Sequence, residues 1–267
     1  MSAMASTTSK LARCFQKIAE GREHKTRIVC FPFAGDALPA SAFRRWQRHL
    51  RHETALWAAR YPGRAERMNE PHPEAVHDLV GELAEAYSRE PVVPTVFLGH
   101  SMGALVAFEL ARRLRDTAHA PARMIVSAFF APQSLTRERD EYGQDDDELL
   151  RRLDALGGTP AEVLRNAELR ELLLPTIRAD FNACDRYIYR HAPPLDCPLI
   201  AMGGYRDPLV KERDIADWKD QTQNEFRVKM FPGGHFYLFS DDAESLVLWT
   251  LVQELKRLRA EWVPTWG

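Results

Sequence analysis

Residues 96–110 read VFLGHSMGALVAFEL, and this stretch decides the fold. A run of β-forming residues at 95–98 meets a G-x-S-x-G motif at 99–103 and continues directly into an amphipathic helical pattern over 102–114. In this motif the serine lies on a sharp strand-to-helix turn, and glycines flank it because side chains would clash there. The turn exposes the hydroxyl at the carboxyl end of a sheet, so the stretch predicts an α/β protein with Ser101 as its candidate nucleophile.

Strand-like and helix-like segments alternate along the rest of the chain. Apolar runs rich in β-forming residues predict six strands, at residues 26–33, 54–61, 95–98, 123–130, 198–202 and 226–231. Helical patterns lie at residues 41–50, 73–87 and 102–114, and a last helix opens at Ser240 as N-cap, with a buried stripe of Val247, Leu248, Leu251, Leu255 and Leu258. This alternation is typical of a mostly parallel sheet flanked by helices on both faces.

One long segment between the fourth and fifth strands carries no strand signal. Residues 145–156 read as a helix, 159–162 read as a capping box, and a helical pattern continues over 164–189. A structureless loop of this length is uncommon, so we expect a helical insertion over residues 136–192 within a single domain, 1–267. By analogy with other α/β enzymes, such an insertion covers the carboxyl ends of the strands as a lid; a helical decoration away from the site is the alternative.

A nucleophilic serine needs a base and an acid, and both follow in the expected chain order. Serine hydroxyls are poor nucleophiles until a base takes their proton. In this type of fold the acid and then the histidine come after the serine, each following a later strand. Asp207 follows the fifth predicted strand and His235 the sixth, so we expect His235 to accept the Ser101 proton and Asp207 to orient the imidazole. The competing acids precede the fifth strand: Asp180, Asp185 and Asp196.

The remaining requirement is an oxyanion hole. One donor is expected from the backbone N–H of Met102, the residue after the nucleophile. The second is expected from the loop after the first predicted strand, near Ala34, within one residue. His100 lies inside the motif but is expected to be structural. These parts together predict acyl transfer through an acyl-serine intermediate, which needs no metal or organic cofactor.

The composition excludes several other classes of protein. The chain has 267 residues, of which 45% are hydrophobic and 28% charged, as in ordinary globular proteins. It has no apolar run of membrane-span length and no apolar signal-peptide centre near its beginning, and its four cysteines form no CxxC pair. We therefore expect a cytoplasmic protein with reduced thiols, no zinc site and no membrane partner. No basic run is interleaved with aromatic residues, so a nucleic-acid partner is not expected either.

At this point several motifs together resemble a known family. The matching stretches are CFPFAG at 30–35, YPGRAER at 61–67, GHSMGALVAFELA at 99–111, LGGTP at 156–160 and FPGGHFYL at 231–238. They are similar to the stand-alone type II thioesterases of polyketide and nonribosomal peptide assembly lines, and the resemblance runs from about residue 26 to 258. It implies an α/β-hydrolase fold with a mobile helical lid. It also implies hydrolysis of acyl groups from the phosphopantetheine arms of carrier proteins, which clears stalled or misprimed chains.

The resemblance also assigns roles to individual residues. It places Ser101, Asp207 and His235 on the catalytic triad, and Met102 and Ala34 on the oxyanion hole. The alternative functions are a small-molecule carboxylesterase or lipase with the same triad, a chain-releasing thioesterase domain, and a non-catalytic scaffold of the same fold. We expect the protein to be a monomer.

This chain departs from the family at one position. Members usually read Ala-Gly-Gly where this chain has Ala34-Gly35-Asp36. A carboxylate pointing toward the oxyanion hole would oppose the charge that develops there. We therefore expect Asp36 to face solvent or to pair with a basic residue such as Arg44 or Arg45.

The charge distribution is uneven along the chain. Residues 1–67 hold 13 Lys/Arg against 5 Asp/Glu, whereas the remainder holds 23 against 33. A basic face attracts acidic partners, although solvated helix faces explain such a distribution equally well. If the basic part docks an acidic carrier protein, reversing Arg44, Arg45 and Arg48 raises KM for the carrier-bound substrate and leaves KM for a small thioester unchanged.

Overall fold

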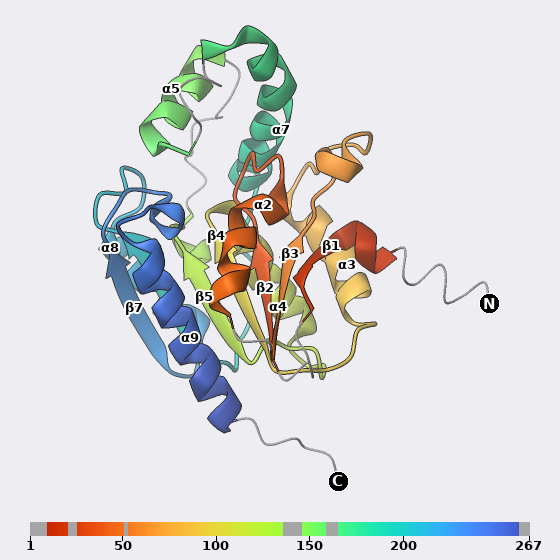
Figure 1. The fold of residues 1–267 in the computed structure, drawn as a ribbon, viewed down its shortest axis with the longest axis vertical. Coiled ribbons are helices and arrows are strands. Elements are labelled where there is room, and N and C mark those ends of the chain that lie inside the picture. The colour runs from red at the N-terminus through yellow and green to blue at the C-terminus, as the bar shows by residue number, and fades with distance from the viewer. Residues whose placement is uncertain (1–9, 21–25, 51–52, 136–145, 159–164, 262–267) are drawn as a thin grey trace, which may run out of the picture.

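The fold is built on a seven-stranded sheet (Figure 1). The computed structural model describes residues 10–20, 26–50, 53–135, 146–158 and 165–261. The strands are β1 (Phe15–Ala19), β2 (Thr26–Phe31), β3 (Thr54–Ala59), β4 (Thr95–His100), β5 (Arg123–Ser127), β6 (Leu199–Gly204) and β7 (Phe226–Phe231). Their order across the sheet is β1-β3-β2-β4-β5-β6-β7. Only the pairing of β1 with β3 is antiparallel among these strands, so the carboxyl ends of the other six lie at one edge.

Helices cover both faces of this sheet. The main ones are α2 (Pro39–Arg44), which continues as the 3₁₀ helix η1 (Arg45–His49), α3 (Val76–Tyr87), α4 (Met102–Leu114), α5 (Asp146–Leu156), α7 (Ala167–Asp185), α8 (Glu212–Ala216) and α9 (Glu244–Glu261). Short 3₁₀ helices are η2 (Ala65–Arg67), η3 (Pro132–Ser134), η4 (Asp217–Gln221) and η5 (Tyr237–Phe239). In Figure 1, α2 and α9 lie in front of the sheet and α3 and α4 behind it. None of the helices in the described ranges is long and apolar enough to cross a membrane.

The strands read as continuous apolar runs because both of their faces are buried. In β2, Val29 and Phe31 pack into the cluster under α3 and α4, whereas Ile28 and Cys30 pack into the cluster under α2 and α9. Side chains of a strand alternate between the two faces, so helices on both sides favour apolar residues at most positions of the strand. All six residues of β2, β3, β4 and β6 are accordingly buried.

The six predicted strands are confirmed, and one further strand was missed. β1 carries the polar residues Gln16 and Lys17 and lies at the edge of the sheet, with only Phe15 fully buried. An edge strand with a polar outer side has little hydrophobic signal. The predicted ends also shift: 26–33 and 54–61 each end two residues early, and the third strand continues to His100.

Four helix predictions need correction, two of them only at their ends: the helix expected over 73–87 begins at Val76, and the pattern over 164–189 is described as the helix Ala167–Asp185. The pattern at 41–50 forms α2 and then η1, because the helix tightens into a 3₁₀ helix after Arg44. The last helix begins at Glu244 and not at Ser240, whose hydroxyl donates to the Tyr237 carbonyl at 3.0 Å and so does not cap the helix. The stripe predicted for this helix is buried as expected.

The insertion between β5 and β6 contributes two described helices, α5 and α7. They stand above the carboxyl ends of the strands in Figure 1. The predicted capping box at 159–162 lies outside the described residues. Further on, α7 is one helix that runs through Pro175. Its residues before Pro175 are exposed or half-buried, and Thr176, Ile177, Asp180, Ala183 and Cys184 after it are buried.

Truncating the stripe of α9 tests the packing of this face. Leu255 is 4% exposed and belongs to the cluster that also contains Ile28, Val96 and Ile125. Leu255→Ala should lower the free energy of unfolding by about 3 kcal/mol, because it removes buried methyl groups and leaves a cavity. Urea unfolding measures this change. Hydrolytic activity below the unfolding temperature should stay unchanged, and a loss of activity in the folded variant would contradict this packing role.

Candidate active site

The turn that carries Ser101 is shaped by a lack of space. A Cβ on Gly103 would lie 2.0 Å from the carbonyl oxygen of Phe31 in β2, and a Cβ on Gly99 would lie 2.2 Å from the carbonyl oxygen of Gly103. Real Cβ atoms do not come this close to backbone atoms, so only glycine fits at both positions. Ser101 itself has φ 53° and ψ −127°, a strained conformation for a residue with a side chain. The chain thus turns from β4 into α4 within one residue and leaves the hydroxyl at the carboxyl edge of the sheet.

The side chain of His100, next to Ser101, is not exposed at this turn. It is fully buried, and its Nδ1 lies 2.9 Å from the hydroxyl of Ser127 in β5. That hydroxyl also contacts the Tyr237 hydroxyl at 2.6 Å. Burial, and then the neighbouring His235, hold the pKa of His100 well below its usual value, so the ring stays neutral. His100 therefore packs the turn from beneath, in the structural role expected from the sequence.

Asp207 and His235 lie on neighbouring loops at the same edge as Ser101. Asp207 follows β6 and His235 follows β7, and these two strands pair in parallel. The Arg206 N–H donates to the Gly233 carbonyl at 2.8 Å, which joins the two loops. Gly204 permits this approach, because a Cβ there would lie 2.3 Å from the Gly234 carbonyl oxygen.

The three side chains form a continuous hydrogen-bonded chain. Oδ1 of Asp207 accepts the backbone N–H groups of Leu209 and Val210 at 2.8 and 3.1 Å, which fixes the carboxylate. Oδ2 of Asp207 lies 2.8 Å from Nδ1 of His235. Nε2 of His235 lies 3.1 Å from Oγ of Ser101. With Nδ1–H donating to Asp207, Nε2 is the basic nitrogen and can accept the Ser101 proton.

The competing acids lie elsewhere. Asp180 is bound to Arg64 in a buried ion pair, and Asp196 is exposed. Asp185 lines the cavity at Ser101. The carboxylate bonded to Nδ1 of His235 is that of Asp207, the acid favoured by the sequence.

Two backbone amides meet Ser101 at one cavity. Ala34, Ser101 and Met102 line a cavity of about 120 Å³. Within the described residues, neither the Ala34 N–H nor the Met102 N–H donates a hydrogen bond. The N–H of Gly35, next in the loop, donates to Asp180 at 2.7 Å and is therefore occupied. The sequence leaves the amides of Phe33, Ala34 and Gly35 open as the second donor. Gly35 is occupied, and of the other two residues only Ala34 lines the cavity that Ser101 and Met102 share.

Comparisons with known proteins show the family to which this chain belongs. A family model described as Thioesterase domain matches residues 26–250. The chain belongs to the thioesterase family. The gramicidin S biosynthesis protein GrsT of Aneurinibacillus migulanus is 38% identical over 223 residues, which cover 83% of this chain and 86% of GrsT.

Solved structures of thioesterases agree with the fold as well. The type II thioesterase BorB from the borrelidin biosynthetic cluster superposes with a TM-score of 0.82 at 31% identity, covering 91% of this chain and 97% of BorB. The thioesterase RedJ from the prodiginine pathway of Streptomyces coelicolor gives a TM-score of 0.79 at 33% identity, covering 86% and 85%. The chain thus has the α/β-hydrolase fold of type II thioesterases, with the mostly parallel sheet expected from the sequence.

The insertion helices of this thioesterase line the space at the serine. Besides Ser101, the 120 Å³ cavity is lined by Arg152 and Leu156 of α5 and by Phe181 of α7. A second cavity of about 60 Å³ contains Ser101, His235 and Ile177. The insertion therefore lies over the site, and the alternative of a decoration away from it is wrong. No group of three His, Cys, Asp or Glu side chains within the described ranges is arranged to hold a metal ion.

The prediction for Asp36 is wrong. Its side chain is only 6% exposed, and it pairs with neither Arg44 nor Arg45. Arg45 instead binds Glu244 at 2.6 Å. Oδ1 of Asp36 accepts the Leu38 N–H at 3.2 Å, and Oδ2 has no hydrogen-bond partner among the described residues. Asp36 lines neither of the two cavities at Ser101, so its carboxylate is buried beside the loop and does not face the reaction space.

Burial changes the acidity of this carboxylate. Desolvation raises the pKa of Asp36 from 3.8 to about 6, against the lowering effects of the Leu38 N–H and Arg64, and Asp180 raises it further. The sequence could not show this, because it does not reveal that the loop is covered. It also gave no sign that Arg64 and Asp180 lie next to this loop, and the YPGRAER stretch was assigned no role.

Asp36→Asn should change the pH dependence of stability. A carboxyl group with a raised pKa in the folded state contributes stability that is fully present below its unfolded pKa and is lost as pH rises through about 6. The variant does not titrate there, so its stability relative to the parent should increase by about 2 kcal/mol between pH 4 and 7. Urea unfolding at several pH values measures the difference. Asp241→Asn, at an exposed carboxylate, controls for the lost charge, and a difference that is constant with pH for Asp36→Asn would contradict the burial effect.

Proposed function

We propose that this thioesterase hydrolyses acyl groups from the phosphopantetheine arms of carrier proteins, with Ser101, His235 and Asp207 as its catalytic triad. The observation that carries the proposal is the hydrogen-bonded chain from Asp207 through His235 to Ser101, next to the Ala34 and Met102 amides, which have no hydrogen-bond partner among the described residues. The similar type II thioesterase BorB comes from the borrelidin biosynthetic cluster, which supports a role in removing stalled or misprimed acyl groups. Carrier proteins are therefore the proposed partners.

In this mechanism the Ser101 hydroxyl attacks the thioester carbonyl while Nε2 of His235 takes its proton. The Met102 and Ala34 N–H groups stabilise the oxyanion of the tetrahedral intermediate. His235 then gives the proton to the departing pantetheine thiol, which leaves an acyl-serine. A water molecule, deprotonated by His235, attacks the acyl-serine; the bond to Ser101 Oγ breaks, His235 returns the proton to that oxygen, and the acid is released. Asp207 keeps the imidazole in the required tautomer and stabilises its charged form.

The surface next to the triad offers a route for the pantetheine arm. A groove of about 760 Å³ contains His235 and Phe236 on one side and Ser41, Ala42 and Arg45 on the other. It thus extends from the triad to α2 and η1, which carry Arg44, Arg45 and Arg48. We propose that the arm lies in this groove and that α5 and α7, within the insertion at 136–192, act as a lid over the acyl group.

Substitution of the nucleophile tests the mechanism. Ser101→Ala should lower kcat for an acyl thioester by about 10⁴-fold or more, because it removes the group that forms the acyl-enzyme. Steady-state hydrolysis with thiol detection measures the loss, and circular dichroism checks the fold. A variant that keeps the parent rate would show that Ser101 is not the nucleophile.

The leaving group separates the proposed function from a carboxylesterase. One acyl group is presented on a carrier protein, on a free pantetheine thioester and as an oxygen ester. We expect the highest kcat/KM for the carrier-bound form, because its binding would use both the groove and the basic surface around Arg44 and Arg48. A marked preference for the oxygen ester would instead favour the carboxylesterase.

Charge reversal tests whether an acidic carrier protein docks on the surface around Arg44 and Arg48. Arg44 and Arg48 are exposed, whereas Arg45 is bound to Glu244 and to the Phe239 carbonyl and is therefore left intact. Arg44→Glu/Arg48→Glu should raise KM for an acidic carrier-bound substrate about tenfold at low salt and leave KM for acyl-pantetheine unchanged. Arg89→Glu/Arg257→Glu carries the same charge change near the C-terminal ends of α3 and α9. Equal effects of the two double variants would contradict a specific docking face.

A further inference from the structure

The segment Tyr61–Arg67 belongs to none of the catalytic steps, yet it carries two buried arginines. It follows β3 and reads YPGRAER. Arg64 and Arg67 are 3% and 4% exposed. Arginine is rarely buried unless it is paired. The backbone around Arg64 is unusual as well, since Gly63 has φ 79° and Ala65 has φ 47°. A buried charge on a strained turn indicates that the position of Arg64 is tightly constrained.

Arg64 reaches across to the insertion and binds α7. Its Nη1 donates to Oδ2 of Asp180 at 2.7 Å, and its Nη2 donates to Oδ1 at 2.5 Å. This is a two-pronged contact between side chains that are 1% and 0% exposed. The geometry of such a pair fixes both partners, and its strength is not reduced by water. Next to it, the Thr176 hydroxyl of α7 donates to the Gly63 carbonyl at 3.2 Å.

The same aspartate holds the loop that follows β2. Oδ2 of Asp180 accepts the Gly35 N–H at 2.7 Å. Gly35 has φ 76°, and a Cβ on it would lie 2.5 Å from Cγ1 of Ile177 in α7. The loop is therefore pressed against the helix with no space between them. The peptide group that joins Ala34 to Gly35 is oriented by this contact with α7.

We propose that Arg64 and Asp180 are positioning residues for the oxyanion hole, a role that rests on the proposed function of Ala34 as its second donor. Asp180 fixes the Gly35 N–H, and this orients the adjoining residue so that the Ala34 N–H faces the cavity at Ser101. Arg64 holds the Asp180 carboxylate in place and balances its charge. This balance of charge matters because Asp180 binds Gly35, the residue next to the proposed donor. Without its pair, the Asp180 carboxylate would oppose the developing oxyanion.

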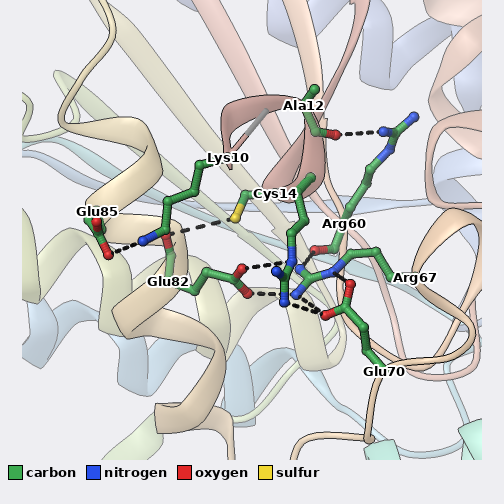
Figure 2. Close-up of polar contacts among 9 residues, drawn as sticks. Lys10, Ala12, Cys14, Arg60, Arg67, Glu70, Glu82 and Glu85 are labelled. Carbon is green, nitrogen blue, oxygen red and sulfur yellow. Dashed lines mark hydrogen bonds and ion pairs between the residues drawn. The ribbon is translucent and has the colours of Figure 1, made fainter. Parts of the chain in front are cut away.

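The far end of the segment is fixed by a second group of charges. Figure 2 shows Arg67 between Glu70 and Glu82, with Nη2 of Arg67 donating to both carboxylates at 2.6 and 2.7 Å. Arg13 binds the same two carboxylates, at 2.8 and 3.2 Å. Nη1 of Arg67 also donates to the Arg60 carbonyl at 3.0 Å. These contacts tie the segment to α3 and to the residues before β1, so Arg64 projects from a rigid base toward α7.

A purely structural pair would have a different signature from a positioning pair. If Arg64 and Asp180 only attached α7 to the core, replacing both by apolar residues of similar size would restore stability and activity together. If they orient the oxyanion donor, the same replacement restores stability alone, because the Gly35 N–H has lost its acceptor. Oxyanion stabilisation acts on the transition state, so the loss should appear in kcat rather than in KM.

The decisive variant is therefore Arg64→Met/Asp180→Leu. With p-nitrophenyl acetate and with an acyl-pantetheine thioester, we expect kcat to fall about 100-fold while KM changes less than about threefold. Asp180→Asn is the matched partner, since its amide oxygen can still accept the Gly35 N–H. It should be less stable than the double variant and yet keep kcat within about tenfold of the parent. Arg64→Met/Asp180→Leu would then be the more stable of the two variants, and Asp180→Asn the one with the higher kcat.

A second measurement separates oxyanion binding from general damage. Phenylboronic acid forms a tetrahedral adduct with a catalytic serine, and its inhibition constant should rise by about the factor by which kcat/KM falls. Leu255→Ala, destabilised at a distance from the site, should keep the parental inhibition constant. If Arg64→Met/Asp180→Leu does not fold, Asp180→Ala takes its place beside Asp180→Asn.

The proposal is overturned by parental kcat in Arg64→Met/Asp180→Leu, or by a loss that appears in KM alone. An equal loss of kcat in Leu255→Ala would overturn the proposal too. Failure of the proposed function looks different: the parent protein would hydrolyse p-nitrophenyl acetate but not carrier-bound thioesters. The ester series would still decide the role of Arg64 and Asp180 in that case.

Discussion

The site depends on one close backbone contact, between α4 and the end of β2. The carbonyl oxygen of Phe31 occupies the place that a side chain on Gly103 would need. The first turn of α4 can therefore lie directly on β2, and the loop that follows β2 comes next to the helix start. Met102 is the first residue of that helix, and Ala34 lies in that loop. One contact thus brings together the nucleophile turn and both proposed oxyanion donors.

Parallel strands account for the rest of the chemistry. β4, β6 and β7 all end at one edge of the sheet, so residues that follow them meet although they are far apart in the sequence. Ser101 and His235 are separated by 134 positions and yet lie within hydrogen-bonding distance. This is why the meeting of Ser101, Asp207 and His235 could be predicted from the sequence alone: the strand pattern places the carboxyl ends, and the chain order selects the residues. The glycines near these ends serve the same purpose, since Gly204 lets the two loops touch.

What escaped prediction has a common physical cause. Arg64 and Asp180 lie 116 positions apart, and neither belongs to a periodic pattern that marks a buried face. Charged residues are exposed in most proteins, so a sequence alone favours a solvated Asp36, and it showed Asp180 only as a competing acid without a partner of its own. Both become buried because α7 covers the loop after β2, and the path of the insertion is not encoded in local pattern. β1 was missed for a related reason, because the polar residues of an edge strand carry little signal.

The charges buried under α7 also bear on how a lid can move. Arg64 offers one positive charge, and its two-pronged contact goes to Asp180, while one carboxylate oxygen of Asp36 has no partner in the part of the chain that the structure describes. Asp180 lies in the half of α7 after Pro175, which is buried against the core, and the half before it is exposed or half-buried. A proline inside a helix removes a backbone hydrogen bond and weakens the helix at that point. Movement confined to the half before Pro175 leaves the bond from the Gly35 N–H to Asp180 intact. The cavity at Ser101 can therefore open on the α5 side without moving the loop after β2, whereas displacement of the whole helix would break that bond and the pair with Arg64 together.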